Sequence, residues 1–242
     1  MKLILSYDGS YYKGWQKQKN TPNTVQETLE RTLSKILGEK VRVIGAGRTD
    51  AGAHAIRQVA NFKTTNTSIP VHKFKKILND SLPHSIRIVR SEEVSLGFNA
   101  RFSAKLRKYV YLMFLGEECL YPFISNYSYI PQKKEWNIEF IRELAKDFLG
   151  EHDFLAISSM RNYKSTIRFV KSLRVFRIRE FMVFSIVANG FMYNMARGIV
   201  SSLLEAERRN DRNFIKSILA KDEKSKPSLV PPNGLYLHRV YY

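Results

Sequence analysis

The chain has 242 residues, of which 44% are hydrophobic, and 40 lysines and arginines against 22 aspartates and glutamates give it a formal net charge of +18. This composition supplies a packed core without covalent staples, and the single cysteine, Cys119, excludes an intramolecular disulfide and a cysteine-rich zinc site. The charge predicts a polyanionic partner, although lysines spread over a solvated surface remain an alternative explanation. Aromatic residues interleaved with basic ones, as in YYKGWQKQK, RKYVY and RNYK, favour single-stranded or splayed RNA.

The N-terminal residues MKLILSYDGS contain an apolar run that is too short for a signal peptide, and no later stretch reaches the length of a membrane span. We therefore expect a protein of the reducing cytoplasm that makes no contact with a membrane.

The first half of the chain alternates strand and helix patterns. KLILSYD predicts a strand over residues 2–8, and Thr24-x-x-Glu27 has the form of a capping box before a helix with apolar helical spacing that Gly38 can end. Further along, the sequence predicts strands over residues 41–46, 56–64 and 85–94 and a second helix over residues 71–82. The resulting order, β-α-β-β-α-β, is that of the split-βαβ or ferredoxin-like plan.

The second half begins near Phe98 without a low-complexity linker, so we expect two packed subdomains, residues 1–97 and 98–242. In the strand LRKYVYLMF, alternation separates a predicted core face from a predicted cleft wall. The core face would hold Leu106, Val110, Leu112 and Phe114, and the cleft wall Arg107, Tyr109, Tyr111 and Met113. The later segments predict a helix ended by Gly150, a strand pair over residues 165–179 and 181–188, a long helix from about residue 191, and a C-terminal strand after PPNG.

The segment GAGRTDAGAH, residues 45–54, crowds three glycines around one arginine and one aspartate. A P-loop would need Lys and Ser or Thr where Ala53 and His54 stand, and a dinucleotide fingerprint would need a glycine at Asp50. The glycines allow a sharp turn or a close ligand, and Arg48 would help to keep the carboxylate of Asp50 ionised. The segment is thus a candidate site, with a simple tight turn as the alternative.

Other polar residues give weaker indications. Lys13, Lys17 and Lys19 are candidate phosphate contacts, although a solvated lysine-rich loop explains them equally well. His54, His152 and Asp8 could be imagined as metal ligands, but no H-E-x-x-H motif or cysteine pair accompanies them, so we expect no metal.

Six blocks of the sequence together resemble one known family, the tRNA pseudouridine synthase A family. They are, in chain order, YDGSYYKGWQKQ, AGRTDAGAH, FNARFSAKLRKYVY, FLGEHDF, FMYNMARGIVSSLLE and PPNGLYLHRVYY. The resemblance extends over essentially the whole chain. It implies an α+β fold of two ferredoxin-like halves that share a mixed, mainly antiparallel sheet with flanking helices and a basic central cleft. It also implies isomerisation of uridine to pseudouridine at positions 38, 39 and/or 40 of the tRNA anticodon stem-loop, by a homodimer without cofactor or metal.

The resemblance carries functional roles onto four residues. It makes Asp50 the catalytic residue, Tyr109 the residue that packs on the target base, Arg197 the salt-bridge partner of the aspartate, and Arg48 a holder of the flipped-out nucleotide. The chain departs from the family pattern at Ala196 and Gly198, which flank Arg197, and in the loop RNYKSTIRFV. Neither departure affects the expected catalysis, but the departure in the loop leaves open how the anticodon arm is held.

The chemistry itself leaves three routes open for Asp50. The carboxylate could attack C1′ of the ribose, attack C6 of the base, or remove the 2′ proton to give a glycal. A hydrolase would need a second carboxylate to activate water, and none stands near. Two other classes of protein remain possible, a noncatalytic RNA-binding protein and a metal-dependent nuclease. The first has no use for an Arg-x-Asp turn among glycines, and the second would need several carboxylates.

Overall fold

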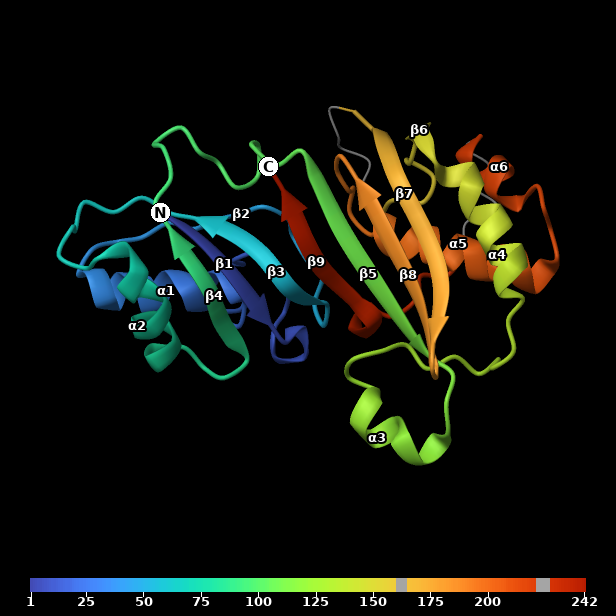
Figure 1. The fold of residues 1–242 in the computed structure, drawn as a ribbon, viewed down its shortest axis with the longest axis horizontal. Helices are drawn as coiled ribbons and strands as arrows, with labels where there is room; N and C mark the ends of the chain where they lie inside the picture. Colours follow the sequence, from blue (N-terminus) through green and yellow to red (C-terminus); the bar gives the residue numbers. More distant parts are fainter. Residues whose placement is uncertain (160–164, 221–226) are drawn as a thin grey trace. The chain divides into compact units, whose positions relative to one another are not determined.

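The computed structural model describes residues 1–159, 165–220 and 227–242, which form two compact units (Figure 1). Unit 1 comprises Met1–Lys105 together with Tyr236–Tyr242, and unit 2 comprises Leu106–Leu235. The expected division at residues 97 and 98 lies eight residues before this boundary. The backbone N–H of Ala100 donates to the side chain of Asn61, and that of Lys105 donates to the carbonyl of Tyr241, so the intervening segment stays with unit 1.

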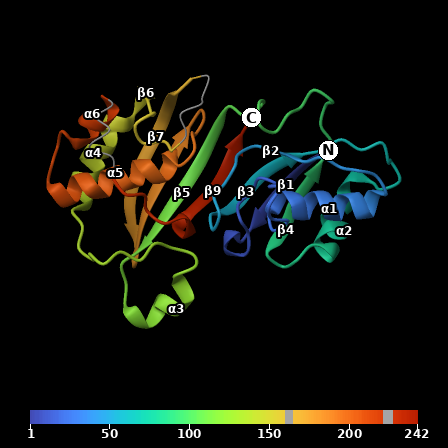
Figure 2. The ribbon, with the colours of Figure 1, turned by 180° about the vertical axis from the view of Figure 1, so that it is seen from behind.

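Unit 1 is a sheet with two helices. Its strands are β1 (Lys2–Tyr7), β2 (Ile44–Gly45), β3 (His54–Asn61), β4 (Ile86–Glu92) and, from Tyr236 on, β9 (Leu235–Tyr241). Its helices are α1 (Val25–Leu37) and α2 (Phe74–Ser81). The predicted β-α-β-β-α-β order is confirmed for the first six elements, and α1 lies in front of the strands in Figure 2.

β1 is the central strand of the order β4-β1-β3 and pairs antiparallel with both neighbours. Two short partners share the far edge of β3, since β2 pairs at Ile44 and Gly45 and β9 pairs in parallel from Tyr236. β2 is shorter than the strand predicted over residues 41–46, because side chains of α1 bind the backbone that precedes it. The N–H of Val41 donates to the hydroxyl of Ser34 and the N–H of Val43 donates to Glu30, both at 3.0 Å. The N–H of Gly47 donates to the side-chain oxygen of Gln58, whose amide donates back to the carbonyl of Gly47 at 2.8 Å.

Helix α1 begins and ends where the sequence predicts. The hydroxyl of Thr24 accepts a hydrogen bond from the N–H of Glu27, which caps the N-terminus, and Gly38 ends the helix in the left-handed region at a φ of 69°. Val25, Leu29, Leu33 and Leu37 are all buried, as their spacing predicts.

Unit 2 is an antiparallel sheet of order β5-β8-β7-β6 with its own helices. The strands are β5 (Leu106–Phe114), β6 (Gly150–Asp153), β7 (Ile167–Ile178) and β8 (Phe181–Ala188). The helices are α3 (Tyr121–Ile124), α4 (Ile138–Ala145), α5 (Met195–Arg209) and α6 (Phe214–Leu219). The helix expected to run up to Gly150 closes as a 3-10 turn at Lys146–Phe148, and Gly150 opens β6. In the described ranges, no helix is both long and apolar enough to cross a membrane.

The predicted faces of β5 are reversed over most of the strand, although Phe114 is buried as predicted, at 2% exposed. Tyr109, Tyr111 and Met113, assigned to a cleft wall, are 5%, 0% and 0% exposed, whereas Leu106 and Val110, assigned to the core, are only half-buried. The two tyrosines are buried because their rings meet other aromatic rings, Tyr109 that of Phe191 at 4.7 Å and Tyr111 that of Phe184 at 6.5 Å. The alternation of side chains along the strand predicts which residues share a face, but it does not predict which of the two faces is buried.

Candidate active site

Asp50 lies in the connection between β2 and β3, on a tight turn. The carbonyl of Asp50 accepts a hydrogen bond from the N–H of Ala53 at 3.1 Å, and Gly52, the third residue of the turn, has a φ of 82°. A positive φ at this position favours glycine, as in a type II turn. Asp50 itself is half-buried and Arg48 is exposed.

A second loop, residues 8–15, packs along this turn through its backbone. The N–H of Trp15 donates to the carbonyl of Thr49 at 3.1 Å, the N–H of Gly52 donates to the carbonyl of Tyr12 at 3.4 Å, and the N–H of Gly9 donates to Nδ1 of His54 at 3.0 Å. The two loops therefore form one hydrogen-bonded layer around Asp50.

Glycines allow the second loop and the connection between β2 and β3 to come this close. A Cβ on Gly9 would stand 1.9 Å from the carbonyl oxygen of Ala53, and a Cβ on Gly14, whose φ is 91°, would stand 2.8 Å from that of Thr49. A Cβ on Gly45 would stand 2.4 Å from the indole ring of Trp15. These three glycines serve the contact between loops, and only Gly45 belongs to the glycine-rich segment in which the sequence indicates a site.

Thr49, directly before Asp50, is held by its side chain as well as by its carbonyl. Its hydroxyl lies 2.8 Å from the phenolic oxygen of Tyr7, and Thr49 and Tyr7 are 6% and 4% exposed. Sequence reasoning missed both residues. The alternation of β1, which buries Leu3 and Leu5, was a usable signal for Tyr7, but nothing in the sequence links it to Thr49.

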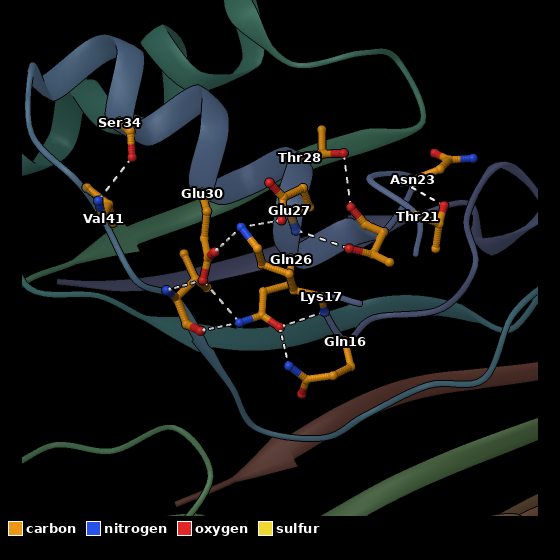
Figure 3. Close-up of polar contacts among 12 residues, drawn as sticks. Gln16, Lys17, Thr21, Asn23, Gln26, Glu27, Thr28, Glu30, Ser34 and Val41 are labelled. Atoms are coloured by element: carbon orange, nitrogen blue, oxygen red, sulfur yellow. Dashed lines mark hydrogen bonds and ion pairs between the residues drawn. The ribbon is translucent and has the colours of Figure 1, made fainter. Parts of the chain in front are cut away.

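Gln26, on the first turn of α1, binds the end of the second loop and the two residues after it (Figure 3). Its backbone N–H donates to the carbonyl of Trp15 at 3.0 Å. Its side-chain carbonyl oxygen accepts from the side chain of Gln16 at 2.7 Å and from the N–H of Lys17 at 2.9 Å. Its amide nitrogen donates to Glu30 and to the carbonyl of Val43, both at 3.0 Å, and Glu30 accepts from the N–H of Val43. One buried side chain thus connects the loop, the helix and the chain that leads into β2.

The three candidate lysines have different surroundings. Lys17 lies 2.5 Å from a carboxylate oxygen of Glu27 and 3.7 Å from one of Glu30, and the hydrogen bond to Glu27 raises the pKa of its ammonium group. Lys13 and Lys19 are exposed. Lys17 is therefore partly neutralised within the protein, which makes it a poorer phosphate contact than the sequence indicates.

Tyr109 and Arg197 belong to unit 2, whereas Arg48 and Asp50 belong to unit 1. Tyr109 lies on β5, and Arg197 lies in the first turn of α5, where its Nε donates to the carbonyl of Val230 at 2.8 Å and its Nη1 donates to the side chain of Asn194 at 3.1 Å. Burial raises the pKa of Tyr111. The positive charge of the nearby Arg197 acts in the opposite direction and lowers this pKa.

The glycine after Arg197, one of the departures from the family pattern, has a structural reason. A Cβ on Gly198 would stand 2.6 Å from the carbonyl oxygen of Ile157. The absence of a side chain lets the first turn of α5 pack against that segment. The other departure, RNYKSTIRFV, falls partly outside the described residues, because residues 161–164 are not among them.

The histidines named as conceivable metal ligands have other contacts. Nδ1 of His54 accepts from Gly9, and its ring stacks on Tyr236 at 4.7 Å, while Nε2 of His152 lies 2.8 Å from the carbonyl of Leu149. Within the part of the chain that the structure describes, no three His, Cys, Asp or Glu side chains are grouped so that they could hold a metal ion.

Known proteins resemble this chain from end to end. A family model described as tRNA pseudouridine synthase matches residues 3–103 and 144–242. The "tRNA pseudouridine synthase A 2" of Bacillus cereus (strain ZK / E33L) is 40% identical over 100% of this chain and 98% of its own length. The "tRNA pseudouridine synthase A" of Thermoanaerobacter sp. (strain X514) is 40% identical over 99% of this chain and 98% of its own, and that of Brachyspira hyodysenteriae is 35% identical over 100% and 98%.

Among solved structures, a chain of "Crystal Structure of a Cbf5-Nop10-Gar1 Complex" superposes with a TM-score of 0.43 and 12% identity, covering 98% of this chain and 49% of that chain. This superposition is too weak to assign a family. The family model and the full-length relatives show that this chain belongs to the tRNA pseudouridine synthase family, a family of isomerases.

Proposed function

We propose that this chain converts uridine to pseudouridine in the anticodon stem-loop of tRNA, at positions 38, 39 and/or 40, with the carboxylate of Asp50 as the catalytic group. The observation that carries the proposal is the turn of Asp50, which two glycine-dependent loops hold in place in a chain of this family. Such a support suits a group that must keep its position during a reaction.

One carboxylate is sufficient for this isomerisation. The N1–C1′ bond breaks, the base turns, and a C5–C1′ bond forms, while the proton lost from C5 is balanced by one gained at N1, so that nothing enters or leaves overall. Asp50 would begin the reaction by attack on C1′, by attack on C6 or by removal of the 2′ proton. No cofactor or metal is needed for any of the three routes.

Three further residues have proposed roles in the substrate complex. The ring of Tyr109 would pack against the uracil, and its phenolic oxygen could receive the C5 proton. Arg197 would pair with Asp50 and keep it ionised, because a neighbouring cation lowers the pKa of a carboxyl group. Arg48, which is exposed beside Asp50, would hold the flipped-out nucleotide. Lys13 and Lys19 are exposed and would serve as phosphate contacts, and they rank above Lys17, which pairs with Glu27.

The test is to incubate the protein with a tRNA transcript that carries uridine at positions 38, 39 and 40 and to map pseudouridine along it, with EDTA present. We expect conversion at one or more of these positions and at no distant uridine. Binding without conversion would indicate a noncatalytic RNA-binding protein, and EDTA-sensitive cleavage would indicate a nuclease. Conversion only outside the anticodon arm would contradict the proposed position.

We further propose that the active form is a cytoplasmic homodimer, because one subunit of 242 residues offers a narrow surface for an L-shaped tRNA. Light scattering at micromolar concentration should give twice the mass of the chain. A monomeric mass under conditions that give full activity would contradict the dimer without affecting the proposed reaction.

A further inference from the structure

The hydroxyl pair formed by Tyr7 and Thr49 is a buried polar contact that the proposed reaction does not use. Its two oxygens lie 2.8 Å apart, and both side chains are almost completely buried. A hydroxyl that leaves water must find a partner, because an unsatisfied one costs more free energy than the hydrogen bond gains. Two apolar side chains of the same shape would fill this space without that requirement.

The pair connects the turn of Asp50 to a rigid part of the fold. Tyr7 is the last residue of β1, the strand that pairs with both β3 and β4, with Ala55 and Ile86 opposite it. Its ring also lies 6.0 Å from that of Trp15, whose N–H donates to the carbonyl of Thr49. The side chain and the carbonyl of Thr49 are therefore anchored to neighbouring parts of the same unit.

Asp50 lies between two fixed points. Thr49 on one side is anchored to Tyr7 and Trp15, and on the other side the carbonyl of Asp50 accepts from Ala53. Loss of the Tyr7 contact would free the side chain of Thr49 and loosen the peptide that carries Asp50, while the turn from Asp50 to Ala53 would remain.

We infer that Tyr7 and Thr49 are positioning residues, whose hydroxyl pair sets the place of the Asp50 carboxylate; the inference rests on the proposed catalytic role of Asp50. A displacement of about 1 Å in a reacting group reduces a rate on the order of a hundredfold, so a loosened anchor should slow the chemical step. Binding of RNA should not change, because neither hydroxyl reaches the surface.

The test compares Tyr7→Phe, Thr49→Val and the double variant, each by single-turnover conversion at saturating tRNA, by tRNA titration and by thermal unfolding. Each single variant removes the hydrogen bond of the buried pair but keeps one of its hydroxyls, and we expect a midpoint lower by about 4 °C and a rate lower by about tenfold or more. The double variant removes both hydroxyls of the pair, so its midpoint should recover while its rate stays low. Thr49→Ser keeps a hydroxyl and should keep most of the rate.

A matched control is present in the second loop. The phenolic oxygen of Tyr12 lies 2.7 Å from the hydroxyl of Ser85, and neither side chain is part of the Asp50 turn. Ser85→Ala breaks this pair from outside both loops, and it should lower the unfolding midpoint to a similar extent and leave the rate within about twofold of wild type, since it disturbs no anchor of Thr49.

Recovery of the rate together with the midpoint in the double variant would overturn the inference, because it would show that the pair serves stability alone. Equal rate losses in Tyr7→Phe and Ser85→Ala would overturn it as well. Asp50→Asn, assayed in parallel, separates the two claims. If Asp50→Asn retains activity, the proposed role of Asp50 fails and the positioning claim fails with it. If Asp50→Asn is inactive and the double variant of Tyr7 and Thr49 converts tRNA at the wild-type rate, only the positioning claim fails.

Discussion

The candidate residues of the two units are held in place in different ways. In unit 1, Asp50 and Arg48 lie on a loop whose shape depends on the close approach of a second loop at Gly9 and Gly14 and on a buried hydroxyl pair with the end of β1. In unit 2, Tyr109 lies within a nine-residue strand and Arg197 within a fifteen-residue helix, so the regular backbone supports them. The first site should fail when a single methyl group is added to a neighbouring glycine, whereas the second should tolerate changes of side chain and lose only function.

Among the substitutions that test this difference in stability, Gly9→Ala should have the largest effect. The added Cβ would stand 1.9 Å from the carbonyl oxygen of Ala53, a contact that only a backbone shift can relieve, and we expect the free energy of unfolding to fall by about 3 kcal/mol or more. Urea unfolding followed by circular dichroism measures the change.

Gly97→Ala is its matched control, since a Cβ there meets nothing within 4 Å and the residue has no positive φ. Its unfolding free energy should stay within about 1 kcal/mol of wild type, on the stabilising side. Equal effects of the two substitutions would show that close packing of the loops does not determine stability here.

In unit 2 the corresponding change is Arg197→Lys. Lysine keeps the positive charge but cannot donate from two directions at once, as Nε and Nη1 of Arg197 do to Val230 and Asn194. We expect single-turnover conversion to slow by about tenfold to a hundredfold, roughly 1.4 to 2.7 kcal/mol of activation free energy, with little change in stability. A rate within twofold of wild type would remove Arg197 from the proposed site.

Helix capping provides a smaller comparison between the units. Thr24 caps α1 in unit 1 through the N–H of Glu27, and Asn137 caps α4 in unit 2 through the N–H of Phe140. Thr24→Ala and Asn137→Ala should each lower the free energy of unfolding by about 1 kcal/mol. Thr24→Ala should have the larger functional effect, because α1 also carries Gln26, which holds the second loop. Parallel urea titrations and rate measurements test both parts.

The smallest expected effect is a pH dependence in unit 1. A hydrogen bond from Lys2 lowers the pKa of Glu92, against the opposing effect of burial. A carboxyl group with a depressed pKa stabilises the fold above its ordinary pKa, and this contribution is lost as the pH falls through the lowered value. The difference in unfolding midpoint between the wild type and Glu92→Gln should therefore be positive at pH 6 and shrink at pH 3. A constant difference would show that the ion pair adds nothing.

The sequence predicted what local periodicity and capping determine. The capping box at Thr24, the glycine end of α1 and the β7–β8 strand pair follow from residue spacing, and the structure confirms them. The buried face of β5 could not be predicted, because both faces carry large apolar groups and only the tertiary contacts of Tyr109 and Tyr111 decide between them. The short length of β2 likewise depends on tertiary contacts, since Ser34 and Glu30 of α1 accept the N–H groups of Val41 and Val43.

The candidate site divides in the same way. The glycine-rich segment identified Asp50 and Arg48 because unusual composition is visible locally. The anchors Tyr7, Trp15 and Gly9 lie more than thirty residues earlier, and their contacts with Thr49, Ala53 and His54 exist only in the folded chain. Sequence reasoning therefore locates the proposed chemistry, and the structure is needed to see what supports it.

Asp50→Asn tests the central claim most directly. Asparagine suits the turn and keeps its backbone hydrogen bonds, but it cannot act as a nucleophile or as a general base. Single-turnover conversion of a tRNA with uridine at positions 38 to 40 should fall by about a thousandfold or more, roughly 4 kcal/mol of activation free energy, while the affinity for tRNA and the unfolding midpoint stay near those of the wild type. Activity within tenfold of the wild type would contradict the assignment of the chemistry to Asp50.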